Sequence, residues 1–180
     1  MIYIFLADGF EEIEALAPVD LLRRCGLNAV TVGVTGKTVT GSHNIQVTAD
    51  ITVEEAVLNS DLEMIVLPGG MPGTLNLEKS SFVQNAIDYC SENNIYIAAI
   101  CAAPSILGHK GLLKNKRAVC YEGFEEQLEG AYIGTDSVEA DGKIITARGA
   151  GVAVKFGLKL AELLLSPEVS DNLKKSILCD

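Results

Sequence analysis

The feature that most constrains this chain is the apolar run at residues 95–100, which ends on Cys101 and is followed closely by Pro104. Six apolar or β-favouring residues without polar alternation are typical of a strand buried on both faces, as at the centre of a parallel sheet. Pro104 cannot lie within that strand, but its fixed φ and missing N–H suit the first turn of a helix. The sequence therefore predicts that Cys101 lies on a tight strand-to-helix turn, the position of a nucleophile elbow.

Cys101 at such a turn faces the free N–H groups of the following helix, which favour the thiolate over the thiol. A helix terminus contributes about 0.3 to 2 kcal/mol, which lowers a thiol pKa by at most about 1.5 units from about 8.5. We therefore expect a nucleophilic Cys101 that titrates near neutral pH. The alternative interpretation is a small buried hydrophobe at a strand end, because unpaired cysteine is among the most buried residue types.

The rest of the chain alternates between strand and helix patterns. Strands are predicted at residues 2–6, 28–33, 63–67, 95–100 and 117–121, and helices at residues 10–25, 52–59, 82–93, 148–165 and 167–179. Asp141 and Gly142 predict a hairpin turn between two short antiparallel strands. This alternation predicts an α/β fold with a doubly wound, mostly parallel sheet, in a single domain spanning residues 1–180.

Composition and charge narrow the set of partners. The chain carries 24 acidic and 14 basic side chains, a net charge of −10 without a Lys/Arg cluster, so neither nucleic acid nor an anionic membrane surface is expected to bind. Residues 2–7 are apolar but lack a basic leader and predict a first strand, and no segment reaches the roughly 18 to 20 apolar residues of a membrane span. Five cysteines without CxxC or Cys/His spacing predict neither a metal nor a cofactor, and favour a reducing cytoplasm.

Glu14 is the candidate acid or base. Together with Glu11 and Glu12 it falls in the first turn of the helix after the first strand, where carboxylates complement the helix dipole. That explanation suffices for Glu11 and Glu12, but Glu14 follows Ile13 on the expected apolar side. A carboxyl near the core, at the carboxyl end of a parallel strand, needs a partner in the crevice where such sheets bind ligands.

Gly69 and Gly70 follow the predicted strand at residues 63–67. Glycines at the carboxyl end of a strand let the backbone approach a ligand closely and expose N–H groups, as an oxyanion hole requires. The loop lacks the Gly-Lys-Ser/Thr of a phosphate-binding loop. Its composition therefore favours an oxyanion pocket over a nucleotide site.

Four motifs occur in a fixed order across residues 2–166: Gly-Phe-Glu-Glu-Ile-Glu (9–14), Leu-Pro-Gly-Gly (67–70), Ala-Ala-Ile-Cys-Ala-Ala-Pro (98–104) and Ala-Arg-Gly (147–149). In order and spacing they resemble the ThiJ/PfpI superfamily, and look closest to the branch that contains the Parkinson-disease-associated protein deglycase. The resemblance implies a flavodoxin-like sandwich that forms a homodimer, with Cys101 at the elbow and Glu14 hydrogen-bonded to its sulfur. Backbone N–H groups of Gly69, Gly70 and Ala102 would line the oxyanion pocket, with Arg148 and Gly149 as further pocket or dimer contributors.

The histidines depart from the family pattern. Protease-like members carry a histidine directly after the cysteine, where this chain has Ala102, so a peptidase is not expected. Members of the deglycase branch often carry a histidine near the end of the strand after the elbow helix, where this chain reads Val-Cys-Tyr-Glu (119–122). His109 lies roughly 12 Å from Cys101 along a helix, and His43 lies in a polar loop that only a partner subunit could bring to the site. Tyr121 and His43 of a partner subunit both stay open as replacements.

Two functions fit these residues, and members of the family have been associated with both. The first is a glyoxalase III- or deglycase-type enzyme, in which Cys101 attacks an α-oxoaldehyde, or a glycated thiol or amine, and Glu14 moves the proton. The alternative is an oxidative-stress sensor or chaperone-like protective protein, whose Cys101 thiolate is oxidised without turnover. Both use the same two residues, so the sequence does not separate them.

Overall fold

A seven-stranded sheet forms the centre of the computed structural model, which describes residues 1–179. The strand order is β10-β11-β7-β6-β1-β2-β5, and only β10 runs antiparallel to its neighbour. The strands of this sheet are β1 (Ile2–Leu6), β2 (Ala29–Gly33), β5 (Ile51–Thr52), β6 (Met64–Leu67), β7 (Tyr96–Ile100), β10 (Val138–Asp141) and β11 (Ile144–Ala147). Two small ribbons lie outside it, β3 (Thr38–Thr40) with β4 (Gln46–Thr48) and β8 (Arg117–Ala118) with β9 (Tyr132–Ile133).

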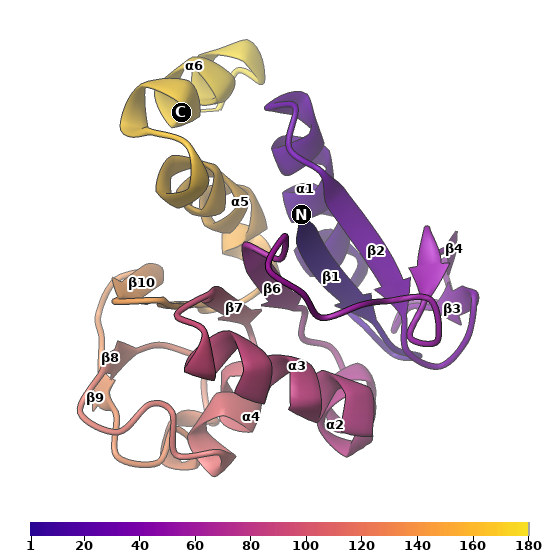
Figure 1. The fold of residues 1–180 in the computed structure, drawn as a ribbon. Coiled ribbons are helices and arrows are strands. Elements are labelled where there is room, and N and C mark those ends of the chain that lie inside the picture. Colours follow the sequence, from indigo (N-terminus) through magenta and orange to yellow (C-terminus); the bar gives the residue numbers. More distant parts are fainter. Residues whose placement is uncertain (180) are drawn as a thin grey trace.

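Helices cover both faces of this sheet (Figure 1). They are α1 (Glu12–Arg24), α2 (Gly73–Lys79), α3 (Ser81–Glu92), α4 (Pro104–His109), α5 (Ala153–Leu164) and α6 (Pro167–Ser176), with short 3-10 turns at Glu125–Gln127 and Ala150–Val152. Alternate residues of each central strand face opposite layers: Ile4 packs with α1 and α5, whereas Phe5 packs with α3 and α4. This two-sided burial explains the unbroken apolar runs of β1, β6 and β7.

The doubly wound sheet confirms the predicted fold class, and the hairpin turn at Asp141 and Gly142 lies between β10 and β11 as expected. The predicted helix at residues 52–59 is wrong. Thr52 is instead the last residue of β5 and pairs with Gly33 of β2. The Thr52 N–H donates to the Glu55 carboxylate, and a single turn follows the strand. Helix α2 was not predicted, because it opens on Gly73 without a side-chain cap.

Two further expectations need correction. The strand predicted at residues 117–121 is limited to β8, because the chain turns away to enclose a cavity described below. Ile13 is 56% exposed although it was expected on the buried face of α1.

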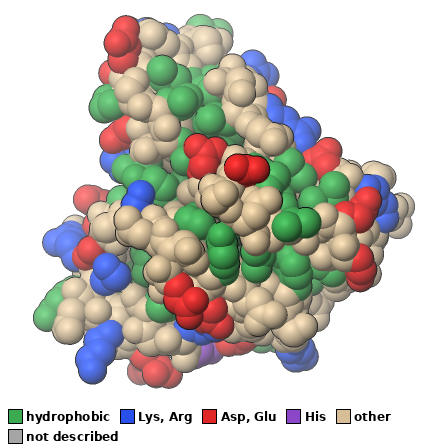
Figure 2. Space-filling view, in the orientation of Figure 1, with side chains coloured by type: hydrophobic (Ala, Val, Ile, Leu, Met, Phe, Trp, Pro, Cys, Tyr) green, Lys and Arg blue, Asp and Glu red, His purple; other side chains and the backbone are tan. Residues whose placement is uncertain are grey.

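None of the helices in residues 1–179 has the length and apolar character needed to cross a membrane. On the face drawn in Figure 2, acidic and basic side chains lie interspersed with apolar ones.

The parallel register places the carboxyl ends of β1, β6 and β7 at one edge of the sheet. The segments that leave these ends carry Glu14, Gly69 and Cys101, respectively. The topology therefore brings together three residues that are far apart in sequence, as doubly wound sheets do at their ligand-binding edge.

Candidate active site

Cys101 lies at the turn between β7 and α4, as the sequence predicts. Its φ is 65°, in the left-handed region that few non-glycine residues adopt and that is frequent at functional sites. Two backbone hydrogen bonds hold this conformation: the Cys101 N–H donates to the Ala147 carbonyl at 2.9 Å, and the Tyr121 N–H donates to the Cys101 carbonyl at 2.8 Å. The elbow is therefore fixed from both sides by neighbouring chain segments.

Glu14 reaches the same place from the first turn of α1 and is completely buried. Its N–H donates to the side chain of Glu11, which caps the helix. Its Oε2 accepts the N–H of Gly69 at 2.9 Å, and its Oε1 has no partner of normal hydrogen-bond geometry among residues 1–179. The carboxyl interacts with the Cys101 thiol. A buried carboxyl with one oxygen that lacks a hydrogen-bond partner can exchange a proton with a neighbouring group, here the Cys101 thiol or a bound substrate.

Burial raises the pKa of Glu14 to about 7, and the Glu11 carboxylate adds to this effect, while the Cys101 thiol and the N–H groups of Gly69 and Ala150 oppose it. Burial, followed by repulsion from the Glu14 carboxylate, raises the pKa of Cys101 to about 12, and the N–H groups of Ala102 and Gly70 oppose that rise. Beside an ionised Glu14, Cys101 is therefore a thiol. The expectation that the helix terminus brings it near neutrality is wrong in that state, because desolvation and a neighbouring charge outweigh a six-residue helix.

The two groups titrate as a pair that loses its first proton near pH 7. When the proton resides on Glu14, the repulsion disappears and the carboxyl can donate a hydrogen bond to the sulfur. Glu14 is thus suited to accept the thiol proton during attack, which makes a permanently formed thiolate unnecessary.

The glycines predicted for this site pack directly against the pair. A Cβ at Gly69 would lie 2.6 Å from both Cys101 Cβ and Glu14 Oε2, so no larger residue fits there. Gly70 has a φ of 88°, and a Cβ on it would meet the Glu11 nitrogen at 2.4 Å. The structure thus brings together all five residues predicted for the centre, and the N–H groups of Gly70 and Ala102 act on the Cys101 sulfur.

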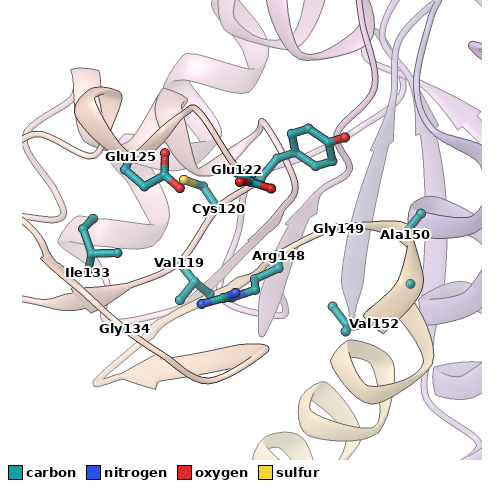
Figure 3. A pocket seen from close by; sticks show the side chains of 12 residues that line it. Val119, Cys120, Glu122, Glu125, Ile133, Gly134, Arg148, Gly149, Ala150 and Val152 are labelled. Carbon is teal, nitrogen blue, oxygen red and sulfur yellow. The ribbon is translucent and has the colours of Figure 1, made fainter.

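A cavity of about 610 Å³ lies next to this centre, because its lining includes Tyr121 and Gly149, which adjoin Cys101. Figure 3 shows the side chains that line it. It is walled by residues 119–122 and 148–152, with Glu125, Ile133 and Gly134. In Figure 3 the sulfur of Cys120 points toward Glu125, and both are cavity residues that we did not predict. Cys120 was visible in the sequence only as a thiol near a strand end, and the pKa of this thiol is raised to about 11, mainly by burial.

Tyr121, Arg148 and Gly149 all line this cavity. Tyr121 is 54% exposed, and its backbone rather than its hydroxyl is bonded to Cys101. The Arg148 guanidinium donates to the carbonyl of Thr135. Gly149 faces both reacting side chains, since a Cβ on it would be 3.9 Å from Cys101 Sγ and 3.8 Å from Glu14 Oε1.

Neither histidine of the chain is bonded to the pair. The His43 Nδ1 lies 2.9 Å from Glu12 Oε2, and its imidazole remains 69% exposed. This contact corrects the reading of Glu12 as a simple dipole partner, because the Glu12 carboxyl is buried and also accepts the His43 backbone N–H. His109 bonds Glu78 at 2.6 Å on α2.

Glu11, Glu12 and His43 have ligand atoms within 4.8 Å of one another, the closest approach to a metal-binding set among residues 1–179. Both Glu12 oxygens already accept hydrogen bonds, and Glu11 caps α1. These contacts hold the cluster together without an ion.

The sequence and the fold of this chain are both similar to those of known proteins. The model of the DJ-1/PfpI family matches residues 1–163. Protein dj-1beta of Drosophila melanogaster is 34% identical over 97% of this chain and 95% of its own length. The glutathione-independent glyoxalase DJR-1.2 of Caenorhabditis elegans is 29% identical over 93% of this chain and 89% of its own. Among solved structures, oxidized Toxoplasma gondii DJ-1 superposes with a TM-score of 0.94 at 33% identity, covering 99% of this chain and 97% of the other.

Proposed function

The chain belongs to the DJ-1/PfpI family, and on that premise we propose that it is a glutathione-independent glyoxalase- or deglycase-type enzyme. Cys101 is the nucleophile and Glu14 the acid and base. The observation that carries the proposal is the buried Cys101–Glu14 pair, in which burial raises the pKa of the carboxyl to about 7. A relative named as a glutathione-independent glyoxalase supports the choice of reaction.

The proposed reaction begins with addition of the Cys101 sulfur to the aldehyde carbon of an α-oxoaldehyde. As the C–S bond forms, the thiol proton passes to Glu14 and the carbonyl electron pair moves onto oxygen. The N–H groups of Gly70 and Ala102, which already act on the sulfur, stabilise that developing charge. Glu14 then returns the thiol proton to the resulting hemithioacetal oxygen and becomes a carboxylate again.

The Glu14 carboxylate next removes the proton from the carbon bonded to sulfur, and the electron pair forms the double bond of an enediol as the ketone oxygen takes a proton. Glu14 then gives its proton to the neighbouring carbon while the hydroxyl on the sulfur-bearing carbon loses its proton, which leaves a thioester on Cys101. Water adds to the thioester carbon, the C–S bond breaks, and the sulfur recovers its proton. The product of methylglyoxal is lactate, so one water is consumed and no external oxidant or reductant is needed. A carboxyl that titrates near pH 7 suits both directions of proton transfer.

The activity is tested by lactate formation from methylglyoxal without added glutathione. We expect turnover by the wild type and none by Cys101→Ala, because the covalent adduct cannot form. Cys179→Ser, three residues beyond the end of α6, serves as a matched thiol control and should retain turnover. Wild-type protein that yields no lactate above buffer would remove the enzyme proposal.

A second candidate function is an oxidation sensor built on the same thiol. The N–H groups of Gly70 and Ala102 beside the sulfur could hold the oxygens of a sulfinate, and the comparison structure of Toxoplasma gondii DJ-1 is named as oxidized. Two equivalents of peroxide would convert the thiol to the sulfinic acid and release two waters. Mass spectrometry that finds Cys101 oxidised before the other four cysteines, in protein without turnover, would favour this function.

We also propose that the chain forms a homodimer in the reducing cytoplasm, where Cys101 stays a thiol. Ile13 and Ile45 are 56% and 54% exposed, and such side chains are candidates for a covered surface. A symmetric dimer could also bring His43 of a partner subunit near the pocket. Light scattering at micromolar concentration tests this proposal, and a monomer would contradict it.

A further inference from the structure

We propose that Gly149 is a specificity-determining residue, whose missing side chain opens the passage from the Cys101–Glu14 pair into the 610 Å³ cavity. Through this passage, the substituent on the carbonyl group under attack extends into the cavity. The inference deepens the proposed function and rests on it. It assigns the cavity as the subsite for that substituent.

The geometry around Gly149 defines the passage. The position that a Cβ would occupy lies 3.9 Å from Cys101 Sγ, 3.8 Å from Glu14 Oε1 and 3.4 Å from Tyr121 Cδ2. The point is therefore in van der Waals contact with the nucleophile, the base and a wall of the cavity at once. Glu14 Oε1, fully buried and without a normal hydrogen-bond partner among residues 1–179, borders the same point. A group bound there would be within reach of both reacting side chains.

The backbone does not explain a glycine at this position. Gly149 has φ 160° and ψ −170°, an extended conformation that any residue can adopt. The contacts of 3.4 to 3.9 Å that its Cβ would make are ordinary packing distances. Gly69 differs sharply, because a Cβ there would overlap the pair at 2.6 Å. The packing around residue 149 therefore does not require a glycine, and what the missing side chain provides is space.

The size of the cavity indicates which substituents enter it. A volume of about 610 Å³ is within the range of pockets that enclose drug-sized ligands, and far exceeds what the methyl group of methylglyoxal fills. Glu122 and Glu125 outnumber Arg148 among its charged residues, which disfavours an anionic substituent. The exposed ring of Tyr121 offers an apolar face. We therefore assign neutral, bulky substituents, branched or aromatic, to this subsite.

The first experiment measures Cys101 alkylation and does not require turnover. Iodoacetamide and its N-benzyl derivative serve as small and bulky electrophiles, and peptide mapping gives the rate at Cys101. In Gly149→Ala we expect the rate ratio of bulky to small reagent to fall at least tenfold from the wild-type value. Ser60→Thr adds one methyl to an exposed residue that does not line the cavity, and should keep the ratio.

The second experiment compares kcat/KM for methylglyoxal and tert-butylglyoxal. Gly149→Ala should lower the value for the bulky substrate at least tenfold more than for methylglyoxal. If the wild type does not turn over, the enzyme proposal fails while the alkylation ratio still decides the role of Gly149. An unchanged ratio in Gly149→Ala overturns the inference, with or without lactate formation.

Thermal unfolding checks the premise that Gly149 is not needed for folding. Gly149→Ala and Gly149→Ser should both unfold within a few degrees of the wild type. Misfolding of both variants would show that the fold requires this glycine, which equally overturns the inference.

Discussion

The Oε2 atom of Glu14 and the backbone nitrogen of Gly69 are 2.9 Å apart, joined by a hydrogen bond between α1 and the loop that follows β6. This bond uses one carboxyl oxygen and leaves Oε1 for the reacting centre. It also favours the ionised carboxyl, yet burial still raises the pKa of Glu14 to about 7. The reactivity of Cys101, the turnover and part of the stability should therefore all depend on this buried carboxyl and its neighbours.

The pH dependence of Cys101 reactivity should report the titration of Glu14. Below pH 7 the carboxyl is protonated and cannot accept the thiol proton, so the alkylation rate should rise with pH and level off above about pH 7. In Glu14→Gln this inflection should disappear, leaving only a rise at higher pH. Iodoacetamide kinetics between pH 5 and 9 measure both profiles, and identical profiles would show that Glu14 is not the base.

Turnover should depend on the same proton transfer. Glu14→Gln retains the size of the side chain and an oxygen that can accept the Gly69 N–H, but it cannot carry a proton between carbon atoms. We expect kcat for methylglyoxal to fall by about 10²- to 10⁴-fold. Tyr121→Phe should have a much smaller effect, because the tyrosine is bonded to Cys101 through its backbone. A comparable loss in Tyr121→Phe would instead assign the proton transfer to its hydroxyl.

Stability should fall with pH because of Glu14. The unfolded chain loses this proton near the ordinary value of 4.5, whereas the folded chain retains it to about pH 7. The stability that comes from the protonated carboxyl is therefore complete below pH 4.5 and lost as the pH rises through 7, by about 3 kcal/mol. Urea unfolding at pH 5 and pH 8 should show this loss in the wild type but not in Glu14→Gln. Other carboxyls titrate in both proteins, so the difference between them isolates Glu14.

Gly69→Ala should damage the site and the fold together. Its Cβ would overlap Cys101 Cβ and Glu14 Oε2 at 2.6 Å. Cys101 Cβ is held by the elbow backbone, and the Glu14 carboxyl is completely buried, so neither atom can move away freely. Overpacking of this kind costs about 1 to 3 kcal/mol. Urea unfolding should show this loss, with Gly149→Ala near the wild type as the control. Wild-type stability in Gly69→Ala would mean that the loop moves easily.

His43 should titrate above its ordinary range. Its hydrogen bond to Glu12, together with the charge of that carboxylate, raises the pKa of the imidazole although the ring is exposed. Glu12→Gln should return the His43 pKa toward 6.5. NMR titration of the His43 imidazole C–H resonances in the wild type and in Glu12→Gln measures both values.

The elbow and its sheet could be predicted because their signals are local. The unbroken apolar run before Cys101 and the proline three residues after it determine a buried strand and a helix start without reference to the rest of the chain. Glu14 was predicted near the core from its place beside Ile13 and at the carboxyl end of the first strand. The first reason is wrong, because Ile13 is exposed, but the position after the strand does bring Glu14 into the core. These predictions depend on the local backbone conformation, which contacts with distant segments rarely change.

The remaining features depend on contacts between distant segments. Helical periodicity assigns Ile13 to the core, but the first turn of α1 lies at the sheet edge, where the loop that carries His43 covers Glu12 instead. No sequence pattern near Glu12 predicts that the loop carrying His43 packs against it. The pKa of Cys101 was misjudged in the same way, since the helix terminus is a local effect whereas desolvation and the Glu14 charge arise only in the folded protein.

The two backbone bonds of Cys101 have a consequence for how this protein can change. Ala147, which accepts the Cys101 N–H, directly precedes the wall residues Arg148 and Gly149, and Tyr121, which donates to the Cys101 carbonyl, is itself a wall residue. Main-chain hydrogen bonds therefore connect the nucleophile to both wall segments of the cavity. Main-chain bonds survive the exchange of side chains. New substrates can therefore be acquired by single substitutions in the walls while the sulfur keeps its position, and divergence of specificity can precede any change in chemistry.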